Sequence, residues 1–332
     1  MDHVRTVAVT GATGFVGREL VRQLLDAGFS VRALVREAGK AREVLGSHTR
    51  LALVPGHIHD GAAPAALVQD CNACINLLGI IREVHEGPYG GQTFARIHVD
   101  ATQVLLTACA NSGIKRFIQM SALGVTPDGR AAYQRSKFEA ELLVRRSGLD
   151  WTIIRPAMIH GPQGEFTQMV RGWVQGTLSP YWFVPYFTRF VEHDDGVALG
   201  RIGFEAAKVA PVRVEDVARA FVASLNVENS IGEIYNVAGP EVMPWNRMLE
   251  FYSENVPRSA KLPILGLPGE PHIYVARLAS FFGLGAWLPF DDGMPSMAQE
   301  DGTADLSKLR AHLGVQPRAF RESAREYLPQ MA

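Results

Sequence analysis

Val7-Ala8-Val9-Thr10-Gly11-Ala12-Thr13-Gly14-Phe15-Val16-Gly17 begins as an apolar run and then places three glycines at intervals of three residues, ahead of an amphipathic segment. This order is typical of a strand that turns through a dinucleotide-binding loop into a helix. Gly11 permits a tight exit from the strand, Gly14 lets a pyrophosphate approach the backbone, and Gly17 lets the helix pack on the sheet. The free amides at the start of such a helix favour an anion.

The first half of the chain alternates strand-like and helix-like patterns at short spacing. Such alternation predicts an α/β fold, with a Rossmann-type doubly wound parallel sheet covered by helices on both faces. The predicted strands lie near residues 6–10, 30–35, 51–55, 73–78, 116–121 and 151–155, and the predicted helices near 15–27, 62–70, 93–112 and 131–146.

The regular alternation ends after Pro156, where glycine, proline and aromatic residues become frequent. The chain has 332 residues, of which 47% are hydrophobic and 20% charged, and this suits one large or two unequal domains. We expect a dinucleotide-binding domain over residues 1–160, with later returns to the sheet near 212–240. A smaller, interleaved portion over 161–332 would then bind a substrate or a partner.

Composition excludes several classes of protein. A net charge of −1 and a pI near 6.8 argue against a nucleic-acid partner, because phosphate binding needs a concentrated basic surface. Three cysteines favour a reducing compartment over a disulfide framework, and no ligand set predicts a metal. The chain starts directly with its first strand, and no apolar run approaches the 20 residues of a transmembrane span. A cytoplasmic protein follows as the expectation.

The end of the second strand bears on the choice of cofactor. An acidic side chain there hydrogen-bonds the 2′-hydroxyl of NAD, whereas a basic one accommodates the 2′-phosphate of NADP. Arg36 follows Val35 and can clamp a phosphate with two hydrogen bonds, with Lys40 nearby. The sequence therefore favours NADP(H) over NAD(H). Glu37 is the alternative, because an inward-turned carboxylate would take the ribose role.

Ser121, Tyr133 and Lys137 form the candidate catalytic set. Ser121 ends a predicted strand, while Tyr133 and Lys137 are four residues apart on the next helix and share one face. A lysine there can lower the phenol pKa by its charge, so that the tyrosine exchanges a proton, while Ser121 polarises the substrate oxygen. Alternatively, the tyrosine and lysine share an exposed helix face with no catalytic role.

These motifs resemble the extended or atypical branch of the short-chain dehydrogenase/reductase superfamily, over most of the chain. A narrower resemblance, to the group related to the nucleotide-binding accessory subunit of respiratory complex I, rests on residues 117–124 and 235–240. Members of that group hold NADPH. The segments that carry the wider resemblance, in the expected order, are Thr10 to Gly17, Asn76-Leu77-Leu78-Gly79, Tyr133 to Lys137, Arg155-Pro156 and residues 212–218.

The resemblance implies a role for each matching residue. The residues expected to line the pyrophosphate are Gly11, Thr13, Gly14, Phe15 and Gly17. Arg36 would read the adenosine ribose and Asp60 would lie near the adenine. The residues expected at the nicotinamide end are Leu78, Gly79, Lys137 and Pro156. His98, on the helix beside the cofactor, is expected to hydrogen-bond rather than to transfer protons.

The chain departs from the family pattern at two places. His57 stands where relatives often have an acidic residue, which weakens the adenine assignment for Asp60. Ser121 lies only 12 positions before Tyr133, closer than in typical sugar-nucleotide epimerases. This spacing places a nucleotide-sugar epimerase or dehydratase below the other interpretations.

Two functions from different classes therefore remain open. The first is an NADP(H)-dependent oxidoreductase that transfers a hydride to or from a carbonyl or alcohol of an apolar small molecule, with Tyr133 as acid or base. The second is a non-catalytic assembly or sensor protein that holds NADPH while a partner surface does the biological work.

Aromatic residues crowd the start of the second portion, where they indicate either a lid packed on the core or an apolar groove. The uncharged run from Leu278 to Phe290 is too short to span a bilayer but long enough to lie on a membrane or a protein partner. The sequence thus predicts an apolar substrate, with peripheral membrane or protein contact as a further possibility. The crowded aromatic residues are Trp173, Tyr181, Trp182, Phe183, Tyr186, Phe187 and Phe190.

Overall fold

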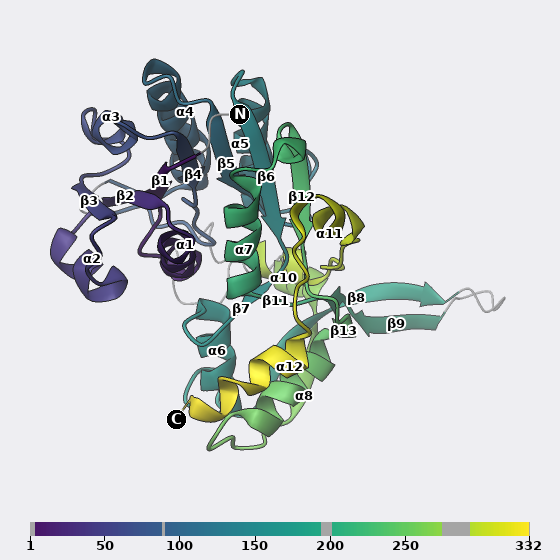
Figure 1. The fold of residues 1–332 in the computed structure, drawn as a ribbon. Coiled ribbons are helices and arrows are strands. Elements are labelled where there is room, and N and C mark those ends of the chain that lie inside the picture. Colours follow the sequence, from purple (N-terminus) through teal and green to yellow (C-terminus); the bar gives the residue numbers. More distant parts are fainter. Residues whose placement is uncertain (1–3, 88–89, 194–200, 274–292, 332) are drawn as a thin grey trace. The chain divides into compact units, whose positions relative to one another are not determined.

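The computed structural model describes residues 4–87, 90–193, 201–273 and 293–331, and the chain divides into two compact units (Figure 1). The first unit comprises Met1–Pro156, Val214–Val237 and Asp305–Pro317. The second unit comprises Ala157–Arg213, Ala238–Ala304 and Arg318–Ala332. The chain therefore passes from one unit to the other several times.

A seven-stranded parallel sheet forms the centre of the first unit. Its strand order is β12-β6-β5-β4-β1-β2-β3, so the order reverses between β1 and β4, and this is a doubly wound topology. The predicted α/β class with a Rossmann-type sheet is confirmed. The strands are β1 (Thr6–Thr10), β2 (Ser30–Val35), β3 (Leu51–Pro55), β4 (Ala73–Asn76), β5 (Arg116–Met120), β6 (Asp150–Pro156) and β12 (Glu233–Val237).

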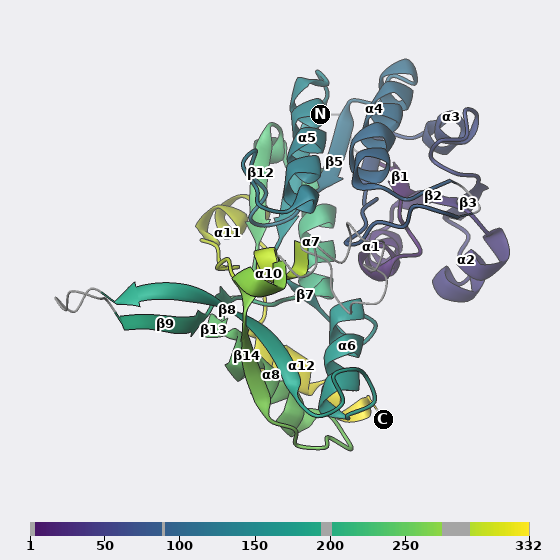
Figure 2. The same ribbon diagram turned by 180° about the vertical axis from the view of Figure 1, so that it is seen from behind.

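Helices cover both faces of this sheet. On one face α1, α7 and α11 pack together, and on the other α3, α4 and α5 do so; Figure 1 views the first group and Figure 2 the second. Burial on both faces explains the continuous apolar runs Val7 to Val9 in β1 and Ala73 to Ile75 in β4. The helices are α1 (Phe15–Asp26), α2 (Ala38–Leu45), α3 (Ala63–Val68), α4 (Ala101–Asn111), α5 (Ala132–Arg146), α7 (Val214–Ser224) and α11 (Ser307–Leu313), with the π-helical turn η1 (Ala95–Asp100) before α4.

Two elements of the first unit differ from the sequence-based expectation. The helix α2 was not predicted, because only Ala41 of its eight residues is buried and no apolar stripe marks it. Residues 212–225 were expected at the sheet together with 233–237. Only the second segment is a strand of it, β12, whereas α7 packs beside α1 through apolar residues at helical spacing, among them Val214, Val217 and Phe221.

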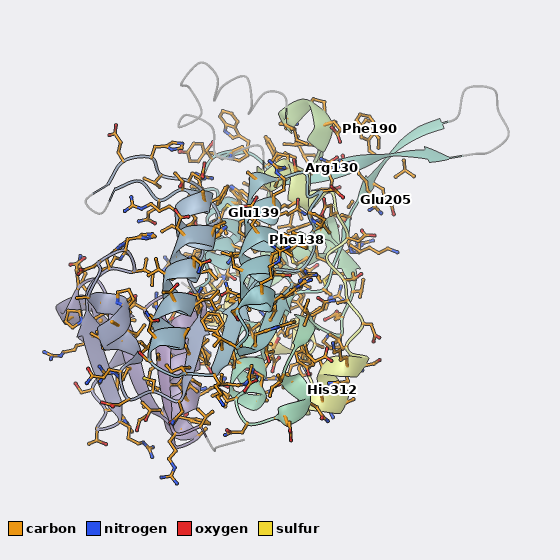
Figure 3. The ribbon with its side chains drawn as sticks, turned by 90° about the horizontal axis from the view of Figure 1, so that it is seen from above. Arg130, Phe138, Glu139, Phe190, Glu205 and His312 are labelled. Carbon is orange, nitrogen blue, oxygen red and sulfur yellow. The ribbon has the colours of Figure 1, made fainter. Side chains whose placement is uncertain are left out.

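The second unit has smaller sheets with helices packed against them. The strands β14, β8 and β9 form a three-stranded sheet, and on its antiparallel pair Phe190 (Figure 3) lies 4.9 Å from Phe204, ring to ring. Its elements are β7 (Ile159–His160), α6 (Glu165–Val174), β8 (Val184–His193), β9 (Arg201–Ala206), β10 (Lys208–Val209), β11 (Val212–Arg213), β13 (Met243–Pro244), α8 (Trp245–Asn255), β14 (Ile264–Pro268), α10 (Gly293–Ala298) and α12 (Phe320–Arg325). Val170, Met248, Tyr252 and Phe320 centre its core.

Candidate functional site

Backbone conformation and close backbone packing require glycine at two of the three glycine positions in the turn between β1 and α1. Gly11 has a φ of +68°, and a Cβ there would lie 3.1 Å from the Leu77 backbone. A Cβ on Gly17 would lie 2.1 Å from the Gly11 carbonyl oxygen, a distance that no side chain tolerates. Gly14 is less confined, since a Cβ there would meet only the Gly11 oxygen, at 3.2 Å. The N-cap residue of α1 is Gly14, which has no side chain to cap the first amides of the helix, so these amides can bind an anion.

A cleft of about 340 Å³ opens where the strand order reverses. We call it the switch-point cleft, because ligands of doubly wound sheets bind at this place. Phe15, Gly17, Asp60, Ser121, Tyr133, Lys137 and Pro156 are not among its lining residues. Of the predicted site residues, the cleft brings together Gly11, Thr13, Gly14, Arg36, Leu78 and Gly79, and it adds His57, which the departure from the family pattern had singled out.

The two candidates for cofactor choice are placed differently. Arg36 lines the switch-point cleft and is exposed. Glu37 does not line it, and its carboxylate forms an ion pair with Lys40, with 2.8 Å between Oε2 and Nζ. Both side chains of that pair are exposed, so it contributes little to stability. The basic side chain is thus the one that faces the cleft.

A buried hydrogen-bond network ties the carboxyl ends of three strands together. Asn76 Oδ1 accepts from Thr10 Oγ1 at 2.6 Å and from the Leu78 amide at 3.2 Å, while its Nδ2 donates to Gln119 Oε1 at 3.0 Å and to Thr102 Oγ1 at 3.2 Å. All the side chains of this network are buried. The network fixes the start of the Leu78-Gly79 loop and was not predicted, although polar residues at the ends of apolar strands were the available signal.

Lys137 is buried on α5, and its ammonium lies at the ends of β4 and β5. Nζ donates to the carbonyl oxygens of Leu78 at 3.4 Å and Met120 at 3.3 Å. Burial lowers the pKa of Lys137 to about 8, against an opposing influence of the Glu141 carboxylate. Gly79 makes room for this ammonium, because a Cβ there would lie 2.8 Å from Nζ. A side chain at position 79 would therefore displace the ammonium from this place.

Ser121 stands directly after β5, and its hydroxyl is isolated. Its backbone amide donates to the Ile154 carbonyl at 2.8 Å. Its Oγ is buried and has no hydrogen-bond partner among the residues that the structure describes. Leaving such a group unsatisfied costs about 1–3 kcal/mol. A buried hydroxyl of this kind is suited to hydrogen-bond a ligand.

Tyr133 is half-buried on the first turn of α5 and packs edge-on against two rings. Its ring centroid lies 5.4 Å from that of His98 and 5.9 Å from that of Phe94. Burial raises the pKa of Tyr133 to about 12. Desolvation has this effect because it disfavours the charged phenolate. The expected lowering of this pKa by Lys137 stays a prediction.

His98 belongs to the π-helical turn η1, and both of its ring nitrogens are hydrogen-bonded. Nε2 lies 3.1 Å from the Ile80 amide and Nδ1 lies 2.8 Å from Ser136 Oγ, which in turn donates to the Tyr133 carbonyl. Burial, with the charge of Lys137, lowers the pKa of His98 to about 2. A neutral imidazole that links the loop at Ile80 to α5 agrees with the expected hydrogen-bonding role.

In the described parts of the chain, no three His, Cys, Asp or Glu side chains gather as they would around a metal ion. None of the helices within those same ranges combines the length and apolar character needed to cross a bilayer.

Comparisons with known proteins indicate an NAD(P)-binding domain. Residues 11–174 match the protein family described as NAD(P)H-binding. Subunit 9 of the NADH dehydrogenase [ubiquinone] 1 alpha subcomplex, mitochondrial, of Arabidopsis thaliana is 30% identical over 262 residues, which is 77% of this chain and 60% of that protein. The NAD(P)H azoreductase of Xenophilus azovorans is 24% identical over 71% of this chain and 69% of its own length. The chain thus spans less than two thirds of the Arabidopsis relative.

A solved structure extends the comparison to the whole fold. UDP-glucuronic acid 4-epimerase from Bacillus cereus, in complex with UDP-glucuronic acid and NAD, has a TM-score of 0.69 and 18% identity over 98% of both chains. At that identity the likeness concerns the fold alone. With its glycine turn, its reversal of strand order and these matches, the chain is similar to the NAD(P)-binding proteins of the extended short-chain dehydrogenase/reductase, epimerase-like group.

Proposed function

We propose that this protein is an NADP(H)-dependent oxidoreductase that interconverts a carbonyl and an alcohol on an apolar small molecule. The observation that carries the proposal is the isolated Ser121 hydroxyl, buried directly after β5 while every polar group of the neighbouring Asn76 network is paired. A protein that used this region only as packing would gain from an alanine there. A hydroxyl kept without a protein partner is explained by a ligand oxygen.

The switch-point cleft fits a nicotinamide dinucleotide. Gly14 and the uncapped start of α1 would hold the pyrophosphate, with Gly11 and Thr13 beside them. Arg36 would bind the 2′-phosphate, which favours NADP(H). Leu78 and Gly79 would border the nicotinamide end. For Phe15 and Asp60, which do not line the cleft, the pyrophosphate and adenine roles stay predictions, as does a place for Pro156 at the nicotinamide ring.

When bound, the nucleotide would supply the hydride, and a side chain of this protein would donate the proton. With a pKa of about 12, Tyr133 is protonated at neutral pH and can donate from its hydroxyl to an oxygen that gains negative charge. Lys137, with a pKa of about 8, is mainly charged at pH 7 and would stabilise the phenolate left behind. Ser121 Oγ would donate to the same substrate oxygen and orient it.

A second candidate is a protein that holds NADPH without turnover and acts through a partner. It is favoured by the 30% identity to a protein named as a subunit of NADH dehydrogenase. The run from Leu278 to Phe290, proposed as a membrane or partner contact, lies outside the described residues and adds no argument. A nucleotide-sugar epimerase ranks third, because the likeness to epimerases is one of fold.

The experiment measures NADPH oxidation with a panel of neutral aryl and alkyl ketones for the wild type, Tyr133→Phe and Tyr181→Phe. The exposed Tyr181 serves as the matched control. We expect Tyr133→Phe to lose turnover at least a hundredfold and to keep its affinity for NADPH, and Tyr181→Phe to behave as the wild type.

The second candidate is separated by the rate at which excess NADP⁺ displaces bound NADPH, followed by nicotinamide fluorescence. Exchange within seconds supports a cofactor that turns over. Absence of oxidation with every ketone, together with exchange over hours, would reject the enzyme and leave the nucleotide-holding protein.

A further inference from the structure

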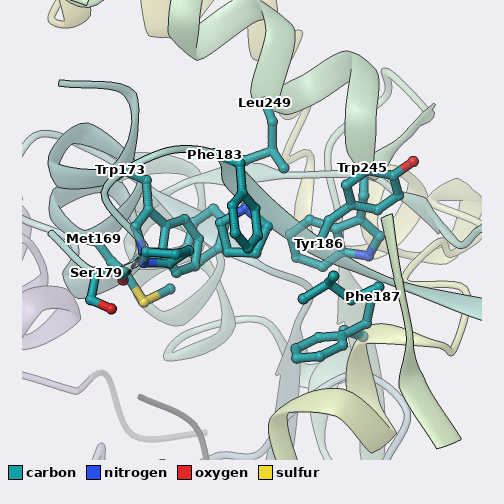
Figure 4. A pocket seen from close by; sticks show the side chains of 13 residues that line it. Met169, Trp173, Ser179, Phe183, Tyr186, Phe187, Trp245 and Leu249 are labelled. Atoms are coloured by element: carbon teal, nitrogen blue, oxygen red, sulfur yellow. Dashed lines mark hydrogen bonds between the residues drawn. The ribbon is translucent and has the colours of Figure 1, made fainter. Parts of the chain in front are cut away.

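A second hollow lies wholly within the second unit. It has a volume of about 230 Å³ and is walled by α6, the segment 179–187, α8, β14 and α10. Figure 4 looks into it and shows the rings of Trp173, Phe183, Tyr186, Phe187 and Trp245 around the space. We call it the aromatic cavity.

Among the residues that the structure describes, none of those lining the aromatic cavity is Lys, Arg, His, Asp or Glu. Burial raises the pKa of Tyr186, so its phenol is neutral at physiological pH. A nucleoside diphosphate or any other anion would enter without a cation to pair with its charge, and transferring an unpaired charge to an apolar site is costly. The lining therefore selects a neutral ligand.

Trp245, which lines the cavity, carries an indole donor without a hydrogen-bond acceptor among the described residues. Nε1 of Trp245 is buried and has no acceptor within the described part of the chain. The other indole of the wall differs, because Trp173 Nε1 donates to the Ser179 carbonyl at 2.9 Å. A ligand that brings an oxygen acceptor to Trp245 would relieve an unsatisfied donor, whereas a pure hydrocarbon would not.

Size and wall chemistry limit the ligand further. An engineered apolar cavity of about 150 Å³ binds benzene, so about 230 Å³ accommodates more than one ring. Aromatic walls favour flat partners that stack or meet them edge to face. We infer that the aromatic cavity binds a neutral, flat, mainly apolar molecule of about two fused rings with one carbonyl oxygen, which accepts a hydrogen bond from Trp245. Only the further step, that this ligand is also reduced, rests on the proposed function.

The test compares three probes of nearly the same shape against the full chain without nucleotide. These probes are 2-acetylnaphthalene, which is a neutral ketone, 2-isopropylnaphthalene, which lacks the acceptor, and 2-naphthoate, which is charged. Titration calorimetry should show the ketone binding about tenfold more tightly than the hydrocarbon, the size of one neutral hydrogen bond, and the carboxylate most weakly. Because no nucleotide is present, the result does not depend on whether the protein is an oxidoreductase.

Two variants locate the binding and one is a matched control. Trp245→Phe keeps a ring and removes the donor, so it should reduce the affinity for the ketone to that for the hydrocarbon. Leu249→Trp should fill the cavity and abolish both affinities. Trp182 is 79% exposed and does not line the cavity, so Trp182→Phe should bind like the wild type.

Three results would overturn the inference. They are a ketone that does not saturate the wild type, a carboxylate that binds as tightly as the ketone, and equal losses in Trp245→Phe and Trp182→Phe. The probe series on the wild type needs no substitution, so it decides the matter even where Leu249→Trp does not fold.

Discussion

The switch-point cleft and the aromatic cavity differ in the groups that line them. The cleft is shaped by backbone: glycines at 11, 14 and 79, the first amides of α1 and loop ends held by the Asn76 network. The cavity is shaped almost entirely by large side chains. A backbone site suits a ligand with several charges, because amides stabilise anions without bringing a countercharge. A ring-lined site suits a neutral, apolar one.

The largest expected effect is on the backbone site. Gly17→Ala places a Cβ 2.1 Å from the Gly11 oxygen, so the turn must move. We expect a loss of about 3 kcal/mol or more in the free energy of unfolding and loss of NADPH binding. Urea unfolding and fluorescence titration measure the two effects.

The control for Gly17 is Gly39→Ala on α2, where a Cβ would meet nothing within 4 Å. That variant should be as stable as the wild type or more so by about 0.5–1 kcal/mol. If Gly17→Ala folds normally and binds NADPH, the cleft does not depend on close backbone packing and the contrast with the cavity fails.

The next effect concerns the buried charge of Lys137. Its pKa of about 8 lies below the unfolded value of about 10.4, so the unfolded chain binds more protons between pH 8 and 10.4. Stability due to this group therefore rises with pH through that window. Lys137→Met should be more stable than the wild type at pH 7, by up to about 3 kcal/mol, and the difference should shrink above pH 8.

Urea unfolding of both proteins at pH 7 and pH 10 measures this difference. Lys40→Met, at an exposed position, should show no such dependence on pH. A difference for Lys137→Met that stays constant with pH would mean that the ammonium is not held in a desolvated place.

Substitutions at Asn76 and Ser121 distinguish a polar side chain that stabilises the fold from one that binds a ligand. Asn76→Leu leaves Thr10, Thr102 and Gln119 without their partner and should cost about 1–3 kcal/mol in the free energy of unfolding. Ser121→Ala removes a buried hydroxyl that has no described partner and should raise that free energy by about 1–3 kcal/mol, while reducing ketone turnover. A Ser121→Ala variant as unstable as Asn76→Leu would show that its hydroxyl is part of the fold.

The smallest effect tests the cofactor preference. Arg36→Met should lower the affinity for NADPH about tenfold and leave that for NADH unchanged, because only the 2′-phosphate loses a charged partner. Competition titrations of both nucleotides measure the ratio, and Arg42→Met on α2 is the control, since Arg42 does not line the cleft. Equal losses for NADPH and NADH would remove Arg36 from the choice of cofactor.

Much of the first unit follows from short-range patterns. The predicted bounds of β1, β2 and β3 agree with the structure, since each strand is a short, mostly apolar run that is followed directly by a glycine or a charged residue. The helix α2 escaped prediction because a helix that buries one alanine has no periodic signal. The π-helical turn η1 also escaped, because η1 and α4 have one apolar pattern in common over residues 95–111.

Some features of the candidate site could likewise be predicted from the sequence, and others could not. Gly11, Gly14 and Arg36 lie together at the cleft, and the spacing of residues in the sequence pointed to all three. The direction of the Tyr133 pKa could not be predicted, because it depends on the packing of Phe94 and His98 around the phenol. The catalytic roles of Ser121, Tyr133 and Lys137 stay predictions until turnover is measured.

Residue spacing alone was enough to predict the glycine turn, the doubly wound sheet and the NAD(P)-binding character of the chain, because a strand-turn-helix unit is formed by consecutive residues. The isolated Ser121 hydroxyl, the lowered pKa of Lys137 and the aromatic cavity appeared only with the fold. Each depends on which distant segments exclude water from a group, and the cavity wall joins residues from Phe166 to Ala298. Desolvation is a property of the packed chain, and no local pattern of residues encodes it.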